Sequence, residues 1–142
     1  MVKKRNVSRT KLFRMVQSCN IEDHKFRPTL EDCIEVFNNI NRQVFYGELK
    51  LPKFRLVYSK DYWGMCVGNW EDHARCSIHI NKSFLSKRLF INTMAHEMVH
   101  QWEWLNHEHM THGSTFFVWR KPLKEFGITL SRSYRIKHYK LD

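Results

Sequence analysis

The chain has 142 residues, the size of one domain, and its apolar (42%) and aromatic (14%) contents are sufficient for a packed core, which excludes wholesale disorder. No apolar run approaches the roughly 18 residues of a membrane-spanning helix, and the basic N-terminus lacks the apolar segment of a secretory signal. We therefore expect a protein of the cytoplasm, nucleus or nucleoid, without contact with membranes.

The formal charge of +10 is concentrated at the two ends of the chain. Residues 1–14 carry six basic side chains and no acid, and residues 120–142 carry seven basic and two acidic ones, so residues 15–119 sum to −1. Basic ends favour a polyanionic partner such as nucleic acid, although a solvated tail would have the same composition. The candidate phosphate contacts are Lys3, Lys4, Arg5, Arg132, Arg135, Lys137 and Lys140.

The predicted elements follow in chain order. Residues 1–27 form a basic arm with a short helix around 8–19, and residues 28–142 form the main domain with a basic tail. Helical apolar spacing over 30–47 begins at Thr29, where Asp32 completes a capping arrangement. Alternating or glycine-flanked segments predict strands at 54–59, 65–70 and 75–81. A long helix over 87–105 and a second over 112–126, shortened or kinked by Pro122, precede an extended segment at 128–139.

This order of elements predicts an α+β domain rather than alternating βαβ units. The four cysteines, which form no C-x-x-C pair, are expected to be buried thiols in a reducing compartment.

The chemistry is concentrated in His96-Glu97-Met98-Val99-His100, an H-E-x-x-H pattern within the long predicted helix. Two histidines four residues apart lie on one helix face and can bind one zinc ion. The glutamate between them is then placed to activate zinc-bound water for attack on a carbonyl and to pass the proton to the leaving amine.

A catalytic zinc takes a third protein ligand and leaves one position open. His112 is the preferred third ligand, because it precedes Gly113 at the start of the next predicted helix and a compact turn there can direct its ring back. His107 and His109 remain alternatives. Glu103 and Glu108 are weaker ones.

The H-E-M-V-H at 96–100, followed by H-G-S-T-F at 112–116, resembles the SprT/Spartan group of zinc metalloproteases. Two upstream segments, V-F-Y-G-E-L at 44–49 and C-S-I-H-I-N at 76–81, are similar to segments of the same family, and the likeness covers roughly residues 30–126. The resemblance implies a small zincin-like α+β fold: an N-terminal helix, a mixed or antiparallel sheet of three to four strands, an active-site helix and a following helix.

The resemblance also implies a function. His96, His100 and His112 would bind one Zn²⁺ per chain, and Glu97 would be the catalytic base of a gluzincin or SprT-like endopeptidase. The substrate would be proteins bound or crosslinked to DNA, in the context of DNA repair. DNA, single-stranded or as a disrupted duplex, would be a partner of a monomeric enzyme. The sequence has no Cys-rich zinc-binding segment of the kind many members append, so we expect the basic ends to contact DNA.

Peptide substrates of zincins often lie along an edge strand beside the metal, and the expected edge strand here is 75–81. Trp63 and Trp70 are the tryptophans best placed to stack on unpaired bases. Two other functions fit the same sequence: a non-catalytic, zinc-stabilised nucleic-acid-binding module, and a metallohydrolase acting on peptides that are not DNA-bound.

Overall fold

The computed structural model describes residues 6–19 and 24–133. Within these ranges the chain forms a short 3₁₀ helix, five α-helices and three strands, and the predicted α+β class is confirmed. In chain order they are η1 (Val7–Arg9), α1 (Lys11–Ser18), α2 (Leu30–Val44), β1 (Lys53–Val57), β2 (Gly64–Gly68), β3 (Cys76–Asn81), α3 (Lys87–His107), α4 (Ser114–Phe117) and α5 (Arg120–Glu125).

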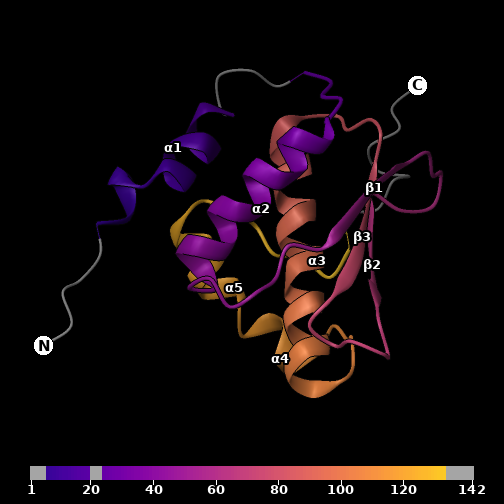
Figure 1. The fold of residues 1–142 in the computed structure, drawn as a ribbon. Helices are drawn as coiled ribbons and strands as arrows, with labels where there is room; N and C mark the ends of the chain where they lie inside the picture. Colours follow the sequence, from indigo (N-terminus) through magenta and orange to yellow (C-terminus); the bar gives the residue numbers. More distant parts are fainter. Residues whose placement is uncertain (1–5, 20–23, 134–142) are drawn as a thin grey trace, which may run out of the picture.

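Helix α3 is the centre of the fold (Figure 1), with α2 on one side, the sheet on the other and α4 near its C-terminal end. Helix α1 packs against α2 and contributes Leu12 and Val16 to the core. Because α3 is covered on nearly all sides, most of its residues from Leu89 to Trp104 are buried, including several polar ones. The polar residues of a central helix need partners within the protein.

The start of α2 confirms the predicted capping arrangement. The Thr29 hydroxyl accepts a hydrogen bond from the Asp32 backbone N–H at 3.1 Å, and the Asp32 carboxylate accepts one from the Thr29 N–H at 2.9 Å. Near the end of the helix, the Asn41 side chain donates to the Leu49 carbonyl at 2.8 Å and accepts from the Leu49 N–H at 3.1 Å. These bonds fix the turn that leads into β1.

The three strands form a mixed sheet in the order β1-β3-β2. Strand β3 pairs with β1 in parallel and with β2 antiparallel. Its buried residues Cys76, Ile78 and Ile80 alternate with Ser77 and His79, as predicted. The expectation that 75–81 is an edge strand is wrong, because β3 is the central strand and β2 is the edge strand that packs on α3.

The predicted helix over 112–126 is two short helices. Pro122 has no N–H to donate to the carbonyl of Val118, and its ring would conflict with that carbonyl in a continuous helix. The chain therefore leaves the helix after Phe117 and begins α5 at Arg120, so that Pro122 lies in the first turn, where proline is tolerated.

The segment after α5 contains no strand as far as Ser133, where the description ends; the remainder of the predicted extended segment lies outside the described residues. Ile128 and Leu130 are buried, and the Thr129 N–H donates to the Asn92 side chain at 3.2 Å. This segment therefore lies along α3, close to the H-E-x-x-H motif.

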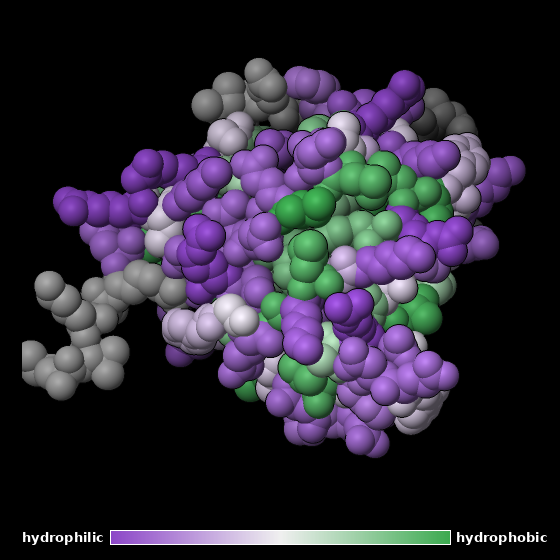
Figure 2. All heavy atoms as spheres, in the orientation of Figure 1, coloured by the Kyte–Doolittle hydropathy of each residue, from purple (hydrophilic) through white to green (hydrophobic). Residues whose placement is uncertain are grey.

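The surface is mainly polar, with apolar side chains gathered where α2 lies beside β1 (Figure 2). Leu30 and Ile34 of α2 are among the exposed apolar residues. All four cysteines are thiols, as expected, and Cys66 is the one that is not fully buried. Within the described residues no helix combines the length and the apolarity that spanning a membrane requires.

Candidate metal centre

The two histidines of the H-E-x-x-H motif lie one turn apart on α3, on the same face, as predicted. Both are buried, and their ring centroids are 4.9 Å apart. Phe116 of α4 is completely buried, and its ring centroid lies 4.8 Å from that of His96 and 4.9 Å from that of His100. The aromatic ring fills the space behind the imidazoles and restricts their rotation.

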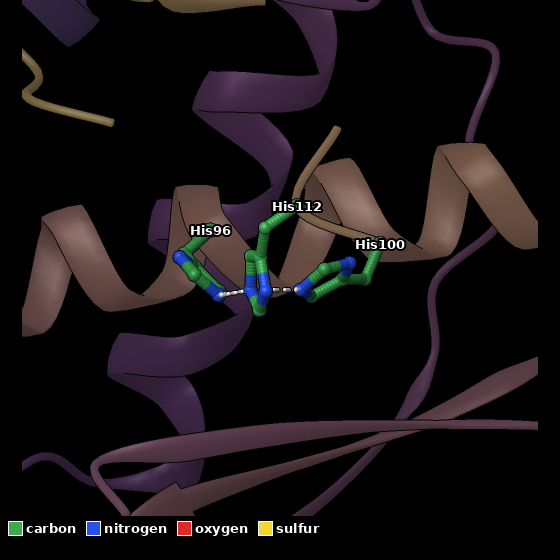
Figure 3. A group of neighbouring side chains, drawn as sticks. All are labelled: His96, His100 and His112. Atoms are coloured by element: carbon green, nitrogen blue, oxygen red, sulfur yellow. Dashed lines mark hydrogen bonds between the residues drawn. The ribbon is translucent and has the colours of Figure 1, made fainter. Parts of the chain in front are cut away.

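His112 reaches the same point from the segment between α3 and α4 (Figure 3). Its Nε2 atom is 3.2 Å from Nε2 of His100 and 3.3 Å from Nε2 of His96. One nitrogen from each of the three rings lies within 4.8 Å of the others, so these histidines form a group that could hold a metal ion. The structure thus brings together the three preferred ligand residues.

The alternative third ligands lie elsewhere. The His107 ring packs against Trp102, and the His109 ring stacks on His107, with centroids 5.5 Å apart. Nε2 of His109 lies 3.2 Å from the Thr115 hydroxyl. Neither ring belongs to the cluster found among the described residues.

Hydrogen bonds at the far side of each α3 imidazole fix its tautomer. The Ser131 carbonyl oxygen lies 2.9 Å from Nδ1 of His96, and a Glu103 carboxylate oxygen lies 2.8 Å from Nδ1 of His100. Carbonyls and carboxylates accept hydrogen bonds, so both Nδ1 atoms carry the hydrogen and both Nε2 atoms present a lone pair. The hydrogen of an Nδ1 atom is what directs Nε2 towards a metal.

Two of the three nitrogen separations in the cluster match those of a zinc site. Zinc binds imidazole nitrogen at about 2.0–2.1 Å, and tetrahedral geometry then separates two ligand nitrogens by about 3.3–3.4 Å. The two short distances from His112 match this separation. His112 carries at most one hydrogen on Nε2 and can donate it to the Nε2 atom of only one of the other two histidines. In the remaining pair, two nitrogen lone pairs face each other unless a cation lies between them. The three histidines therefore fit a zinc ion.

The rings are also held in the uncharged form that binds metals. Burial, together with His100 and His112, lowers the pKa of His96 to about 3. Burial likewise lowers the pKa of His100, against the opposing effect of Glu103, and it lowers the pKa of His112 together with the charge of Arg132. Neutral imidazole is the form that offers a lone pair to a metal.

The side chain of Glu97 extends from α3 towards β2, beside this cluster. One of its carboxylate oxygens is 3.9 Å from Nε2 of His96. Burial raises its pKa to about 8, although a backbone hydrogen bond from Cys66 in β2 acts in the opposite direction. Strand β2 can approach so closely because Gly64 has no side chain: a Cβ there would lie 3.2 Å from a Glu97 carboxylate oxygen.

A pocket of about 200 Å³ opens beside His96, His112 and Glu97. It is lined by Asp61, Tyr62, Trp63, Gly64, Thr93, His96, Glu97, His112, Arg132 and Ser133. Arg132 is exposed and lines this pocket, where its charge acts on the His112 ring. The other predicted phosphate contacts, Lys3, Lys4, Arg5, Arg135, Lys137 and Lys140, lie outside the described residues.

The two tryptophans proposed for base stacking have different environments. Trp63 is partly buried and stacks on Phe84, with ring centroids 5.3 Å apart, so one face of its ring is covered, and it also lines the pocket beside the cluster. Trp70 is 72% exposed and lies edge-on against Trp104. It lines a larger groove of about 920 Å³ near the end of β2, which does not include the histidine cluster.

Comparison with known proteins identifies one family. The SprT-like family matches residues 33–138, which is most of the chain and includes the whole histidine cluster. No curated protein matches the sequence.

Proposed function

The chain belongs to the SprT-like family, and we propose that it is a zinc-dependent endopeptidase that cleaves proteins bound or crosslinked to DNA. One observation carries the proposal: three imidazole nitrogens lie within 4.8 Å of one another, two of their separations match zinc-ligand spacing, and a buried carboxylate lies 3.9 Å from one of them. The described residues supply three ligands to this point and no fourth. Three ligands and a neighbouring carboxylate are typical of a catalytic zinc site rather than a structural one.

When bound, zinc would act as a Lewis acid that polarises a carbonyl and lowers the pKa of water. The proton transfers belong to Glu97. Its carboxylate lies at the pocket beside the imidazoles, where it can take a proton from water and return it to the leaving amine. Burial raises the pKa of Glu97 in the metal-free protein, and a neighbouring cation would favour the ionised form, which is the form that accepts a proton.

The free edge of β2 offers a way to bind an extended substrate. This strand begins at Gly64, beside Glu97, and its outer edge is unpaired among the described residues. A peptide pairing with that edge would use backbone hydrogen bonds and would therefore be recognised with little sequence specificity. Such breadth suits an enzyme that removes many different DNA-bound proteins.

The association with DNA is supported by charge and by the family resemblance. The formal charge of +10 is concentrated at the two ends of the sequence, and Arg132 brings one of these basic groups to the pocket. Contacts between basic side chains and phosphates release counterions, so binding that depends on them weakens steeply as salt rises.

The test measures zinc content and cleavage of a basic DNA-binding protein by the full chain and by Glu97→Gln. Each is assayed with and without single-stranded DNA over a series of salt concentrations. We expect about one zinc per chain in both proteins, cleavage by the wild type only, and stimulation by DNA that declines with salt. Zinc binding without cleavage would favour the non-catalytic module, and cleavage indifferent to DNA would favour a hydrolase of free peptides.

A further inference from the structure

Glu103 is a buried carboxylate that the chemistry above does not use. It lies one turn beyond His100 on α3, and it is completely inaccessible to solvent. Its oxygens accept hydrogen bonds from Nδ1 of His100 at 2.8 Å, the Thr111 hydroxyl at 3.0 Å and the Thr115 hydroxyl at 2.6 Å. The Thr111 backbone N–H lies 3.2 and 3.3 Å from its two oxygens. Both oxygens are therefore already occupied by donors, which excludes Glu103 as a metal ligand in this arrangement.

The partners of Glu103 lie on both sides of the third histidine. Thr111 immediately precedes His112, and Thr115 follows it in the first turn of α4. The Thr115 hydroxyl gives its single hydrogen to Glu103, so its contact with His109 must be a bond donated by Nε2 of His109. One carboxylate thus anchors the segment that carries His112 at two points and, through Nδ1, sets the orientation of His100.

The number of these bonds indicates a role beyond packing. A carboxylate with no solvent exposure is unfavourable in a protein interior unless hydrogen bonds replace its hydration. The part of the chain that the structure describes supplies Glu103 with no lysine or arginine partner within 4 Å. Its direct donors are His100 and two threonines, and Nε2 of the more exposed His109 lies 3.8 Å away. His100 belongs to the histidine cluster, and the two threonines lie on either side of His112 in the sequence.

We propose that Glu103 is a positioning residue that preorganises the metal centre by holding His100 and the His112 segment in register. The inference depends on the proposed metal site but not on protease activity. Without the carboxylate, the His100 ring can rotate or exchange tautomer, and the turn before α4 loses its attachment to α3. Residues that orient metal ligands in this way typically contribute about 10- to 100-fold in metal affinity.

Two variants of the full chain test the proposal. Glu103→Gln keeps the shape but presents an amide N–H₂ to groups that are themselves donors, so at least one of the bonds is lost. Thr115→Val removes one hydroxyl and keeps the carboxylate. Glu108→Gln is the matched control, because Glu108 lies at the same end of α3, is exposed, and its carboxylate is 4.0 Å from Nε2 of His73.

The measurements are zinc affinity by competition with a chelator, the visible spectrum of the Co²⁺-substituted protein, and the melting temperature of the metal-free protein. We expect zinc affinity to fall about 10- to 100-fold in Glu103→Gln and less in Thr115→Val, with an altered Co²⁺ spectrum in both and none of these changes in Glu108→Gln. A purely structural role would lower the melting temperature without changing the affinity or the spectrum.

The outcomes separate this inference from the proposed function. Wild-type affinity and spectrum in both variants would overturn the positioning role, and if Glu103→Gln does not fold, Thr115→Val decides the question alone. A wild-type chain that binds no zinc would overturn both proposals. A wild-type chain that binds zinc without cleaving protein would overturn the protease and leave the role of Glu103 intact.

Discussion

Replacing Gly64 by alanine tests whether the approach of β2 to α3 positions Glu97. A Cβ at residue 64 would lie 2.7 Å from Cγ2 of Thr93 and 3.1 Å from Cγ of Glu97. Both distances are shorter than ordinary van der Waals contact, so either the strand or the glutamate must move. Overpacking of this kind destabilises a fold by about 1–3 kcal/mol.

The effect on catalysis should exceed the effect on stability. Thr93 and Glu97 lie one turn apart on the rigid central helix, so part of the adjustment is a displacement of the Glu97 side chain. A misplacement of about 1 Å in a reacting group can reduce the rate about 100-fold. We therefore expect kcat/KM of the zinc-loaded Gly64→Ala protein to fall by about this factor, with zinc affinity nearly unchanged.

Gly47→Ala is the matched control. Gly47 has a φ of +78°, and a Cβ there meets no atom within 4 Å, so the cost is backbone strain alone, about 1–2 kcal/mol. The assay compares kcat/KM per zinc-loaded molecule with the free energy of unfolding in urea for both variants. Equal losses of activity in the two variants, or wild-type activity in Gly64→Ala, would refute the reasoning.

Two further predictions concern the metal-free protein and the third ligand. Because burial raises the pKa of Glu97 from 4.5 to about 8, its contribution to stability is complete below pH 4.5 and is lost as pH rises through 8. His96, whose pKa is lowered from 6.5 to about 3, offsets this loss up to pH 6.5, so the metal-free wild type should lose about 2 kcal/mol between pH 6.5 and 8. Urea unfolding of Glu97→Gln should lack that loss, and an identical pH profile would contradict the assignment. For the third ligand, His112→Ala should abolish tight zinc binding in a chelator competition while His107→Ala preserves it; the reverse result would reassign the ligand.

Much of the site was predictable because its signals are local. The H-E-x-x-H pattern predicts two imidazoles on one helix face, and the structure has them there with ring centroids 4.9 Å apart. The capping arrangement at Thr29 and Asp32 is likewise a matter of residues three apart in sequence. Local periodicity also predicted α3, which extends only two residues beyond the expected end.

Strand order was not predictable in the same way. The alternation in β3 shows which of its side chains face the core, but it does not show which strands lie on either side. The expected edge strand is central because β1 arrives in parallel on one side and β2 returns antiparallel on the other. That arrangement depends on how the intervening connections cross the sheet, which the pattern of a single strand does not encode.

The residues that support the ligands were also missed, for two different reasons. Ser131 acts through its backbone carbonyl, 35 residues from His96, so no side chain signals its role. Glu103 was predictable in part, because a carboxylate three residues after a helical histidine lies on the same face. The sequence presents Glu103 only as a weak alternative ligand, whereas the structure shows it bonded to Nδ1 of His100, on the side of the ring away from the cluster.

The burial of α3 affects both the geometry of the ligands and the stability of the metal-free protein. A helix buried on nearly all sides holds its side chains rigidly, which suits a metal centre whose ligands must meet within a few tenths of an ångström. The same burial makes the metal-free site unfavourable, because it forces imidazole lone pairs towards each other and raises the pKa of Glu97. A cation that separates the lone pairs and favours the ionised carboxylate relieves both effects. Binding of a cation would therefore be coupled to the stability of the domain, and in the metal-free protein the apolar core around α3 must supply that stability.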